Sequence, residues 1–187
     1  MTLDGRIATD AGDARWVSGP PARGVVQQLR GGVDAIVVGG NTVRLDDPQL
    51  TLREDPRGSG SGGADPLLGG GLPPSVPMVS VEVVGQAPLD AGGVATALGA
   101  RGCMSVLWEC GGGLAGAAMA AGVVQRVVAF VAPKVVGGGV YGPVGGFGLT
   151  AMADALPLRD VRVGLVGEDV MVVGEVGATE PKGDMGV

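Results

Sequence analysis

The chain has 187 residues, which is enough for one domain with its own hydrophobic core and favours one domain over two. Its formal net charge of -6 argues against a nucleic-acid-binding protein, because nucleic-acid affinity depends mainly on clusters of Lys and Arg. The sequence contains no histidine. This excludes a Ser-His-Asp catalytic triad, a Cys-His catalytic pair, a His-ligated zinc site and an imidazole general base.

Targeting and metal-binding signals are also missing from the sequence. No window of about 18 residues is continuously apolar, so we expect no membrane span. The start, MTLDGRIATD, has charges where a secretory signal has its apolar region. Cys103 and Cys110 are too few for a zinc cluster, and they would lie on opposite faces if one strand joined them. We therefore expect no metal, two reduced thiols and an intracellular soluble protein, either cytoplasmic or plastidic if a transit peptide is missing.

The first half of the chain predicts a helix, a strand and a long loop. Pro20 and Pro21 can open a helix, and Gly31 with Gly32 can close it. The segment DAIVVGGN, residues 34–41, reads as a buried strand that turns into a loop. Residues 54–75 are rich in Gly, Ser and Pro without periodicity, so a flexible loop is expected there.

The second half alternates between strand and helix patterns. Strands are expected at 77–85, 104–109 and 123–139, and helices at 89–102 and 114–122. This order predicts an α/β fold with a mostly parallel sheet and helices on its faces. Residues 161–176 predict an antiparallel hairpin with its turn at 167–169. The domain would cover residues 1–176, and residues 177–187 would form a disordered tail.

The stretch VLWECGGGLAG, residues 106–116, falls where a strand passes into a helix. Backbone N–H groups at a helix N-terminus bind anions, and glycine permits a close approach, so a phosphate could lie here. The spacing does not match the full Gly-x-Gly-x-x-Gly fingerprint with its following acidic residue. Tight packing of the helix on the sheet also explains the glycines, and on the pattern alone it is the simpler interpretation, so both interpretations stay open.

Several side chains have a functional and a structural interpretation. Arg30 and Arg53 could bind a phosphate through forked hydrogen bonds, or they could be surface residues. Asp46 could position a reacting group, whereas Asp47 fits a turn before proline. Glu109 ends a strand, where open α/β sheets place their ligands, and it could equally be an exposed acid.

Two further residues are similarly ambiguous. Trp16 could stack beside a cofactor or cover the hydrophobic core. Because the chain has only two tryptophans, packing against the core is the safer expectation. Thr42 could cap a helix or turn through its hydroxyl group, or it could contact a phosphate.

The segments MTLDGRIATDAGDARWVSGPPAR and DAIVVGGNTVRLDDPQLTLR, followed by VLWECGGGLAG and VVQRVVAFVAPKVVGGG, closely resemble the reductase domain of bifunctional riboflavin-biosynthesis deaminase/reductase proteins, in particular the plant and cyanobacterial branch. The resemblance implies a dihydrofolate reductase-like fold, a homodimer, and NADPH-dependent reduction of the ribosyl group of 5-amino-6-(5-phosphoribosylamino)uracil to a ribityl chain. It also implies substrate contacts from Arg30, Gln49, Arg53 and Glu109, a catalytic role for Asp46, and cofactor contacts from Trp16, Thr42, Asp46, Gly111, Gly112, Gly113, Leu114, Ala115, Gly116 and Ala117.

The sequence departs from the family pattern at several points. It lacks the zinc motifs of the deaminase half, the strand that precedes Met1 in the family, and a strand and helix between Arg57 and Met78. Ala14 replaces a substrate-binding serine, and Cys110 often corresponds to glycine. These departures leave two other hypotheses: an inactive, truncated relative that acts at most as a binding or interaction module, and a generic nucleotide-binding α/β protein.

Overall fold

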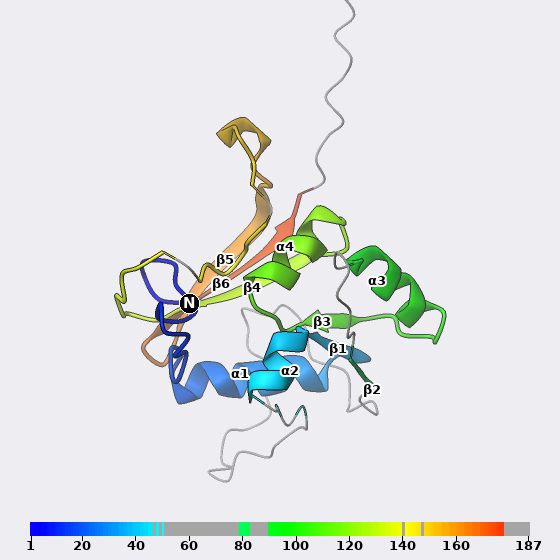
Figure 1. Cartoon of the computed structure of the whole chain (residues 1–187), viewed down its shortest axis with the longest axis horizontal. Coiled ribbons are helices and arrows are strands. Elements are labelled where there is room, and N and C mark those ends of the chain that lie inside the picture. The colour runs from blue at the N-terminus through cyan, green and yellow to red at the C-terminus, as the bar shows by residue number, and fades with distance from the viewer. Residues whose placement is uncertain are drawn as a thin grey trace, which may run out of the picture.

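The computed structural model describes residues 1–46, 48, 50, 79–82, 90–139, 141–146 and 148–177. They form two three-stranded sheets with helices packed around them (Figure 1). The loop expected at 54–75 and the tail beyond residue 177 lie outside the described residues.

The first sheet is parallel and contains β1 (Ala35–Val38), β2 (Val79–Glu82) and β3 (Val106–Trp108) in the order β2-β1-β3. All four residues of β1 are buried, as expected for a central strand covered on both faces. On one face, β1 and β3 pack against α3 (Ala91–Gly99) and α4 (Gly112–Ala120). Asp90 caps the start of α3 by accepting a hydrogen bond from the Gly93 N–H at 2.8 Å.

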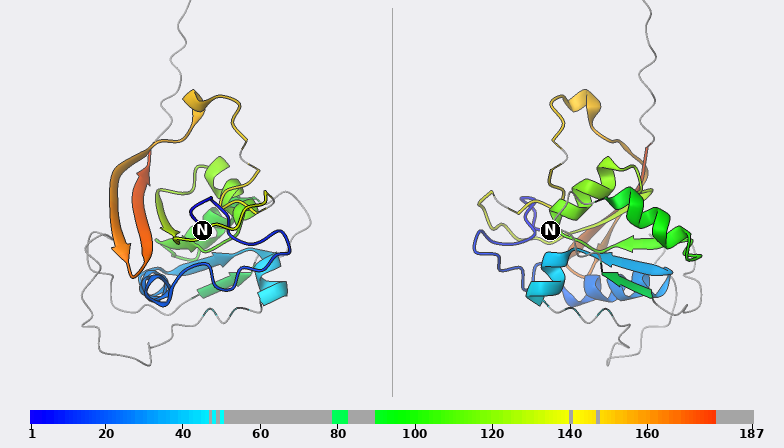
Figure 2. Two further views of the ribbon diagram at one scale, coloured as in Figure 1. Left: turned by 90° about the vertical axis from the view of Figure 1, so that its left-hand side faces the viewer. Right: turned by 45° about the vertical axis from the view of Figure 1, so that its right-hand side comes forward.

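Helix α1 (Pro20–Gly31) lies on the other side of the parallel sheet (Figures 1 and 2). The two prolines occupy its first turn and Gly32 follows its end, as the sequence predicted. The apolar stripe of α1 faces the second sheet and forms a separate core with it, so α1 joins the two sheets. This core comprises Ala22, Val25, Leu29, Val128, Phe130, Val166, Met171 and Val173.

The second sheet is antiparallel, with the order β4-β6-β5, and contains β4 (Arg126–Val131), β5 (Leu158–Val166) and β6 (Asp169–Val176). The predicted C-terminal hairpin is confirmed, and Gly167 supplies the positive φ of +65° that its turn requires. The alternation of strands and helices in the sequence predicted that β4 belongs to the parallel sheet. In the structure, β4 pairs with β6 in the antiparallel sheet instead. Neighbouring elements in the sequence do not reveal this non-local pairing.

The hairpin turn contacts the first turn of α1. The buried carboxylate of Asp169 accepts a hydrogen bond from the Gly19 N–H at 2.8 Å, immediately before the helix. A Cβ atom at Gly167 would lie 2.8 Å from Pro21 Cγ, so only glycine fits this contact without displacing the proline. These contacts fix the orientation of α1 relative to the second sheet.

Helix α2 (Gly40–Asp46) was not predicted, because Gly39 and Gly40 indicated a loop after β1. It has seven residues, and an isolated helix of that length is marginal in water. A 3-10 turn at Met152–Asp154 is another short element that carried no sequence signal.

The N-terminal segment runs beside the end of β4. Thr2 forms a parallel bridge with Ala132, and the Leu3 N–H donates to the Lys134 carbonyl at 2.8 Å. The Asp4 carboxylate accepts bonds from the Thr2 hydroxyl group at 2.6 Å and the Gly137 N–H at 2.7 Å. These bonds lower the pKa of Asp4 to about 2, with the Thr2 bond as the largest cause.

We expect the Asp4 contribution to stability to be complete above about pH 4 and to disappear as the pH falls toward 2, because the folded-state pKa is below the ordinary value of 3.8. Asp4→Asn should therefore be less stable than the wild type in urea denaturation at pH 6. The difference between the two proteins should shrink as the pH falls through 2, because Asp4 then becomes protonated in the folded protein as well. A difference that stays constant across this range would contradict the assignment.

Candidate functional site

The carboxyl ends of β1 and β3 meet at one edge of the parallel sheet, where open α/β sheets place their ligands. Gly39 and Gly40 follow β1 and lead into α2, while Glu109 and the three glycines follow β3 and lead into α4 (Figure 1). The Glu109 N–H donates to the Val37 carbonyl at 3.0 Å, which continues the pairing of the two strands to this edge. The candidate site is therefore built on fixed backbone.

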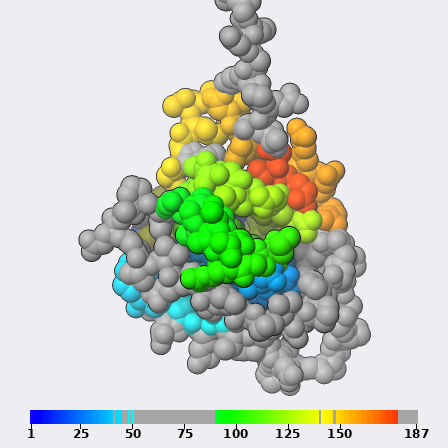
Figure 3. Space-filling view, turned by 90° about the vertical axis from the view of Figure 1, so that its right-hand side faces the viewer, coloured from blue at the N-terminus to red at the C-terminus, as the bar shows by residue number. Residues whose placement is uncertain are grey.

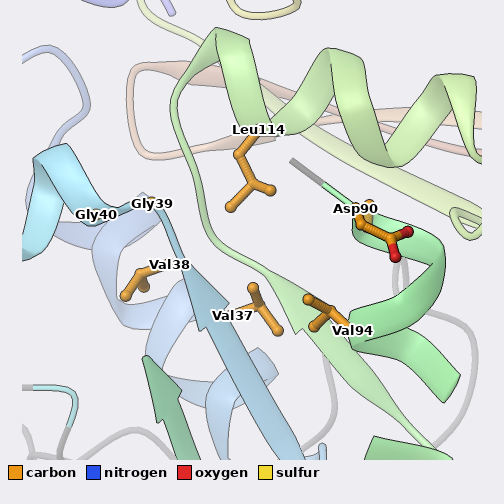
Figure 4. Close-up of a pocket in the computed structure, with 8 residues that line it drawn as sticks. Val37, Val38, Gly39, Gly40, Asp90, Val94 and Leu114 are labelled. Carbon is orange, nitrogen blue, oxygen red and sulfur yellow. The ribbon is translucent and has the colours of Figure 1, made fainter. Parts of the chain in front are cut away.

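A pocket opens at this edge between β1, α3 and α4 (Figure 4). Val37, Val94 and Leu114 point into it from three different elements, as the close-up shows. Val38, Gly39, Gly40, Asp90 and Ala91 complete its wall. The two helices lie side by side on the surface (Figure 3). The enclosed part of the pocket is small, about 20 Å³, which is room for roughly one water molecule, so a ligand would lie across its open mouth on these apolar side chains.

The glycines around the start of α4 have two different roles. Gly111 is the N-cap residue and offers no side chain to the first turn, and Cβ atoms at Gly111 or Gly113 would meet nothing within 4 Å. At Gly112 and Gly116, in contrast, a Cβ atom would overlap the carbonyl oxygens of Gly142 and Gly145. The Gly145 N–H also donates to the Gly112 carbonyl at 2.9 Å. Close packing therefore explains Gly112 and Gly116, whereas Gly111 and Gly113 leave the helix start open to an anion.

Arg30 and Glu109, which are 79 residues apart, form a forked ion pair. Arg30 Nε donates to Glu109 Oε2 at 2.7 Å, and Nη2 donates to Oε1 at 2.5 Å. Only 11% of the Arg30 side chain is exposed, against 33% for Glu109. The pair joins the last turn of α1 to Glu109, which lies two residues before Gly111. We call the segment from Gly111 to Ala117 the glycine corner. The forked face of Arg30 is thus already occupied by a carboxylate, and Nη1 is the nitrogen that this pair leaves for another acceptor.

The ion pair and the pocket lie on opposite sides of the β3 end. Trp108 packs into the core formed with α3 and α4, whereas the next residue, Glu109, bonds to Arg30 of α1. Successive side chains of a strand point to opposite faces, which accounts for this division. A ligand that contacts both features must therefore cross the sheet edge at the glycine corner.

Trp16 is not in the core, so the core-packing default was wrong. The residue is 64% exposed, and the Arg23 guanidinium carbon lies 4.5 Å from the ring centroid. Lys134 Nζ donates to the Trp16 carbonyl at 2.7 Å and to the Val17 carbonyl at 2.9 Å. Because Arg23 and Arg30 lie seven positions apart on α1, these contacts stand about 10 Å along the helix from the Glu109 pair.

The other predicted site residues are placed only in part. Thr42 lies in the first turn of α2, with its hydroxyl oxygen 3.9 Å from the position of a Cβ atom at Gly39, beside the pocket wall. The backbone of Asp46 ends α2, but its side chain is outside the described residues. Gln49 and Arg53 are outside them altogether. The predicted roles of Asp46, Gln49 and Arg53 therefore stay predictions.

Both cysteines are free thiols, and both pack against the core beneath α3 and α4. The condition for opposite faces is not met, because β3 spans three residues and neither cysteine belongs to it. Burial, with a smaller contribution from the Glu109 charge, raises the pKa of Cys110 to about 11.

We expect Cys110 to react slowly with iodoacetamide, because about one thiol in a thousand is ionised at pH 8 when the pKa is near 11. A Cys103→Ser variant isolates this thiol, and its rate of alkylation is measured by mass spectrometry with and without urea. The rate should rise about a hundredfold on unfolding, as the pKa returns to about 9. Equal rates in the two states would show that Cys110 is accessible and ionised in the folded protein.

Some residues at the site had not been singled out in the sequence. Asp90 and Val94 line the pocket, and an Asp immediately before a helical pattern is a recognisable N-cap signal that could have drawn attention to this end of α3. Arg23 and Lys134 carry no local signal for their contacts with Trp16, because these contacts depend on the tertiary fold. Within the described residues, no helix is long and apolar enough to span a membrane, and no cluster of acidic, Cys or His side chains could hold a metal ion.

Comparison with known proteins gives consistent matches. The profile of the family described as the RibD C-terminal domain matches residues 1–67 and 74–172. The chain is 40% identical over 203 residues to the chloroplastic riboflavin biosynthesis protein PYRR of Arabidopsis thaliana, covering 93% of this chain and 33% of that protein. It is 34% identical to the riboflavin biosynthesis protein RibD of a Synechocystis strain, covering 100% of this chain and 58% of that protein. The chain thus spans about a third to just over half of these relatives.

Solved structures show the same fold. Acinetobacter baumannii RibD superposes with a TM-score of 0.70 at 21% identity, covering 94% of this chain and 55% of that chain. A Thermotoga maritima deaminase/reductase superposes with a TM-score of 0.69 at 23% identity, covering 94% of this chain and 54% of that chain. These neighbours confirm the dihydrofolate reductase-like α/β fold expected from the sequence.

Proposed function

The chain belongs to the RibD C-terminal domain family, and from this membership we propose that it reduces the ribosyl group of 5-amino-6-(5-phosphoribosylamino)uracil to a ribityl chain with NADPH. The observation that carries the proposal is the glycine corner after Glu109, which joins an open helix start to an apolar pocket at the sheet edge. When bound, the cofactor supplies the hydride, so the protein has only to bind, align and exclude water. Because the cofactor carries out the hydride transfer, this function does not require a histidine, and the chain has none.

The corner suits the cofactor in its shape and polarity. The first N–H groups of α4 have no partner within the helix and no capping side chain, and the absence of a side chain at Gly111 and Gly113 lets a phosphate approach them. The neighbouring pocket offers Val37, Val94 and Leu114 to an apolar or planar group. We propose that the corner from Gly111 to Ala117 binds the dinucleotide together with Thr42, Asp46 and Trp16.

The substrate side of the proposed site contains the Arg30–Glu109 pair. A carboxylate held by arginine still has lone pairs for ribose hydroxyl or pyrimidine N–H groups, and its geometry is fixed before the substrate arrives. With the Arg30 fork engaged, we assign the main contact with the substrate phosphate to Arg53 and a supporting contact to Gln49. Asp46 is proposed to position the reacting groups.

The test is a steady-state assay with purified protein, in which NADPH oxidation is followed with and without the pyrimidine ribotide. We expect oxidation only when both are present, with a ribityl product identified by mass spectrometry. The inactive-relative hypothesis, which the substitution of Ala14 for a serine favours, predicts no oxidation under any condition. Oxidation with unrelated sugars but not with this substrate would overturn the substrate assignment.

We also propose that the protein is a homodimer formed through the outer face of the second sheet. Strand β5 is at the edge of that sheet in the described residues, and Val163 and Leu165 are 60% and 74% exposed. Their cross-strand partners on β6, Val172 and Val170, are also apolar. An apolar face on a chain with a net charge of -6 lets two copies meet without close repulsion, and a twofold axis lets the same face of two copies contact itself.

We expect Leu165→Glu to convert the dimer to a monomer, because each interface would then bury two unpaired carboxylates. Light scattering after size exclusion measures the mass. Met104→Glu is the control, since Met104 is 93% exposed on the loop before β3 and should not alter the mass. A Leu165→Glu protein that keeps the dimer mass would exclude this face.

The proposed compartment is the cytoplasm or a plastid. The Arabidopsis relative is named as a chloroplastic protein, which supports the plastid.

A further inference from the structure

Trp16 is held in place by two cations although most of its ring faces solvent. A tryptophan residue that is 64% exposed contributes little buried area to folding, yet Arg23 lies against one face of its ring and Lys134 binds the carbonyl groups of Trp16 and Val17. The two cations come from α1 and from the segment after β4, which are far apart in the sequence.

Arg23 is itself fixed by a second contact. Its Nη1 atom donates to the Ser18 carbonyl at 2.8 Å, two residues after Trp16, while its guanidinium lies 4.5 Å from the ring centroid. The guanidinium thus bonds to the backbone beside the ring that it covers. This arrangement covers one face of the ring and restricts its motion, while the residue as a whole stays 64% exposed.

Lys134 is equally well anchored. Its carbonyl accepts the Leu3 N–H at 2.8 Å, and its own N–H donates to the Ala132 carbonyl at 2.8 Å, so its backbone is fixed to the N-terminal segment and to the end of β4. Its ammonium group then binds two consecutive carbonyl groups, at Trp16 and Val17. The backbone that carries the indole is therefore fixed from one side and the ring from the other.

From these contacts we infer that Arg23 and Lys134 are positioning residues that hold the free face of Trp16 ready to stack on a planar heteroaromatic ring of the dinucleotide. The inference rests on the proposed function, because it takes NADPH as the ligand. Holding the ring before binding removes the entropy cost of ordering it during binding, which improves affinity without a new contact. The guanidinium beneath the ring and the ligand above it would not touch, so Arg23 would act through Trp16.

The test uses Trp108→Phe, which leaves Trp16 as the single tryptophan, and adds Arg23→Met or Lys134→Met. Each addition should raise the NADPH dissociation constant, read from quenching of Trp16, by about 3- to 30-fold. Affinity for the pyrimidine ribotide, titrated separately by calorimetry, should stay unchanged, and kcat at saturating NADPH should change less than KM. Arg126→Met is the matched control, because Arg126 forms an exposed pair with Glu175 and should leave NADPH affinity unchanged.

A double-mutant cycle separates positioning from direct contact with the cofactor, with NADPH affinity measured by calorimetry. In a Trp16→Leu background, Arg23→Met should cause no further loss of affinity, because there is no ring left to position. The same loss in both backgrounds would mean that Arg23 contacts NADPH itself and would overturn the inference. A loss of affinity for the ribotide instead of NADPH would also overturn it, since the stacked ring would then belong to the substrate.

A further readout is independent of the cofactor. Time-resolved fluorescence anisotropy of Trp16 should show a restricted ring in the parent protein and faster local rotation after Arg23→Met or Lys134→Met. A ring that is equally mobile in all three proteins would contradict positioning even if NADPH binds. Absence of NADPH binding together with a restricted ring would overturn the proposed function and the stacking on NADPH, but it would leave the structural contacts confirmed.

Discussion

Glu109→Ala should lower the free energy of unfolding by about 2–4 kcal/mol, a large share of the 5–15 kcal/mol typical of a domain. The reason is the state of its partner: the Arg30 side chain is only 11% exposed, and both of its bonds to the carboxylate would be lost. The figure is at the low end for a buried pair because a third of the Glu109 side chain faces solvent. Urea denaturation monitored by circular dichroism measures the change.

The control is the double variant Arg30→Met/Glu109→Ala. Removing the charge that was left unpaired should recover at least half of the lost stability, because methionine tolerates a buried apolar position. The exposed pair between Arg126 and Glu175 provides a comparison, and Glu175→Ala should cost no more than about 1 kcal/mol. If Glu109→Ala is as mild as Glu175→Ala, the Arg30–Glu109 pair does not hold α1 to the sheet edge.

Gly116→Ala should destabilise the protein by about 1–3 kcal/mol, which corresponds to a fall in Tm of roughly 2–10 °C. A Cβ atom at this position would overlap the carbonyl oxygen of Gly145, so either α4 or the segment from Gly142 to Gly145 must move. That contact lies next to the proposed phosphate position, and NADPH affinity should fall with stability. Differential scanning calorimetry gives the Tm, and calorimetric titration gives the affinity.

Gly24→Ala is the matched control for Gly116→Ala. Gly24 lies inside α1, is exposed, and would place its Cβ atom more than 4 Å from any neighbour, so the change should stabilise the protein by about 0.5–1 kcal/mol. A Gly116→Ala protein that is stabilised to the same extent would show that α4 and the Gly142–Gly145 segment are not in contact.

Local signals in the sequence predicted most of the elements. Helix α1 was recognisable from prolines at its start and glycines at its end, and the C-terminal hairpin from two apolar runs around Gly167. The antiparallel pairing of β4 with β6 could not be predicted, because it joins segments about 45 residues apart and no local pattern encodes that choice. Helix α2 escaped notice because two glycines after a strand usually indicate a loop.

The sequence could indicate which residues lie at the ends of elements near the site, but not how their side chains pair in space. Arg30 and Glu109 could each be placed at the end of an element, whereas their pairing depends on how α1 packs beside β3. Only a tertiary structure could divide the glycines into those that pack, Gly112 and Gly116, and those that stay open. Trp16 was misjudged because the usual tendency of tryptophan toward burial gave no hint of the cations that hold it at the surface.

We propose that this domain transfers a hydride at the sheet edge beside Glu109, and isotope transfer tests this proposal most directly. The purified protein is incubated with the pyrimidine ribotide and NADPH that carries deuterium at both positions of nicotinamide C4. We expect a ribityl product that carries one deuterium, formed in step with NADP⁺. A ribotide recovered unreduced, from protein that calorimetry shows to be folded and to bind NADPH, would contradict it.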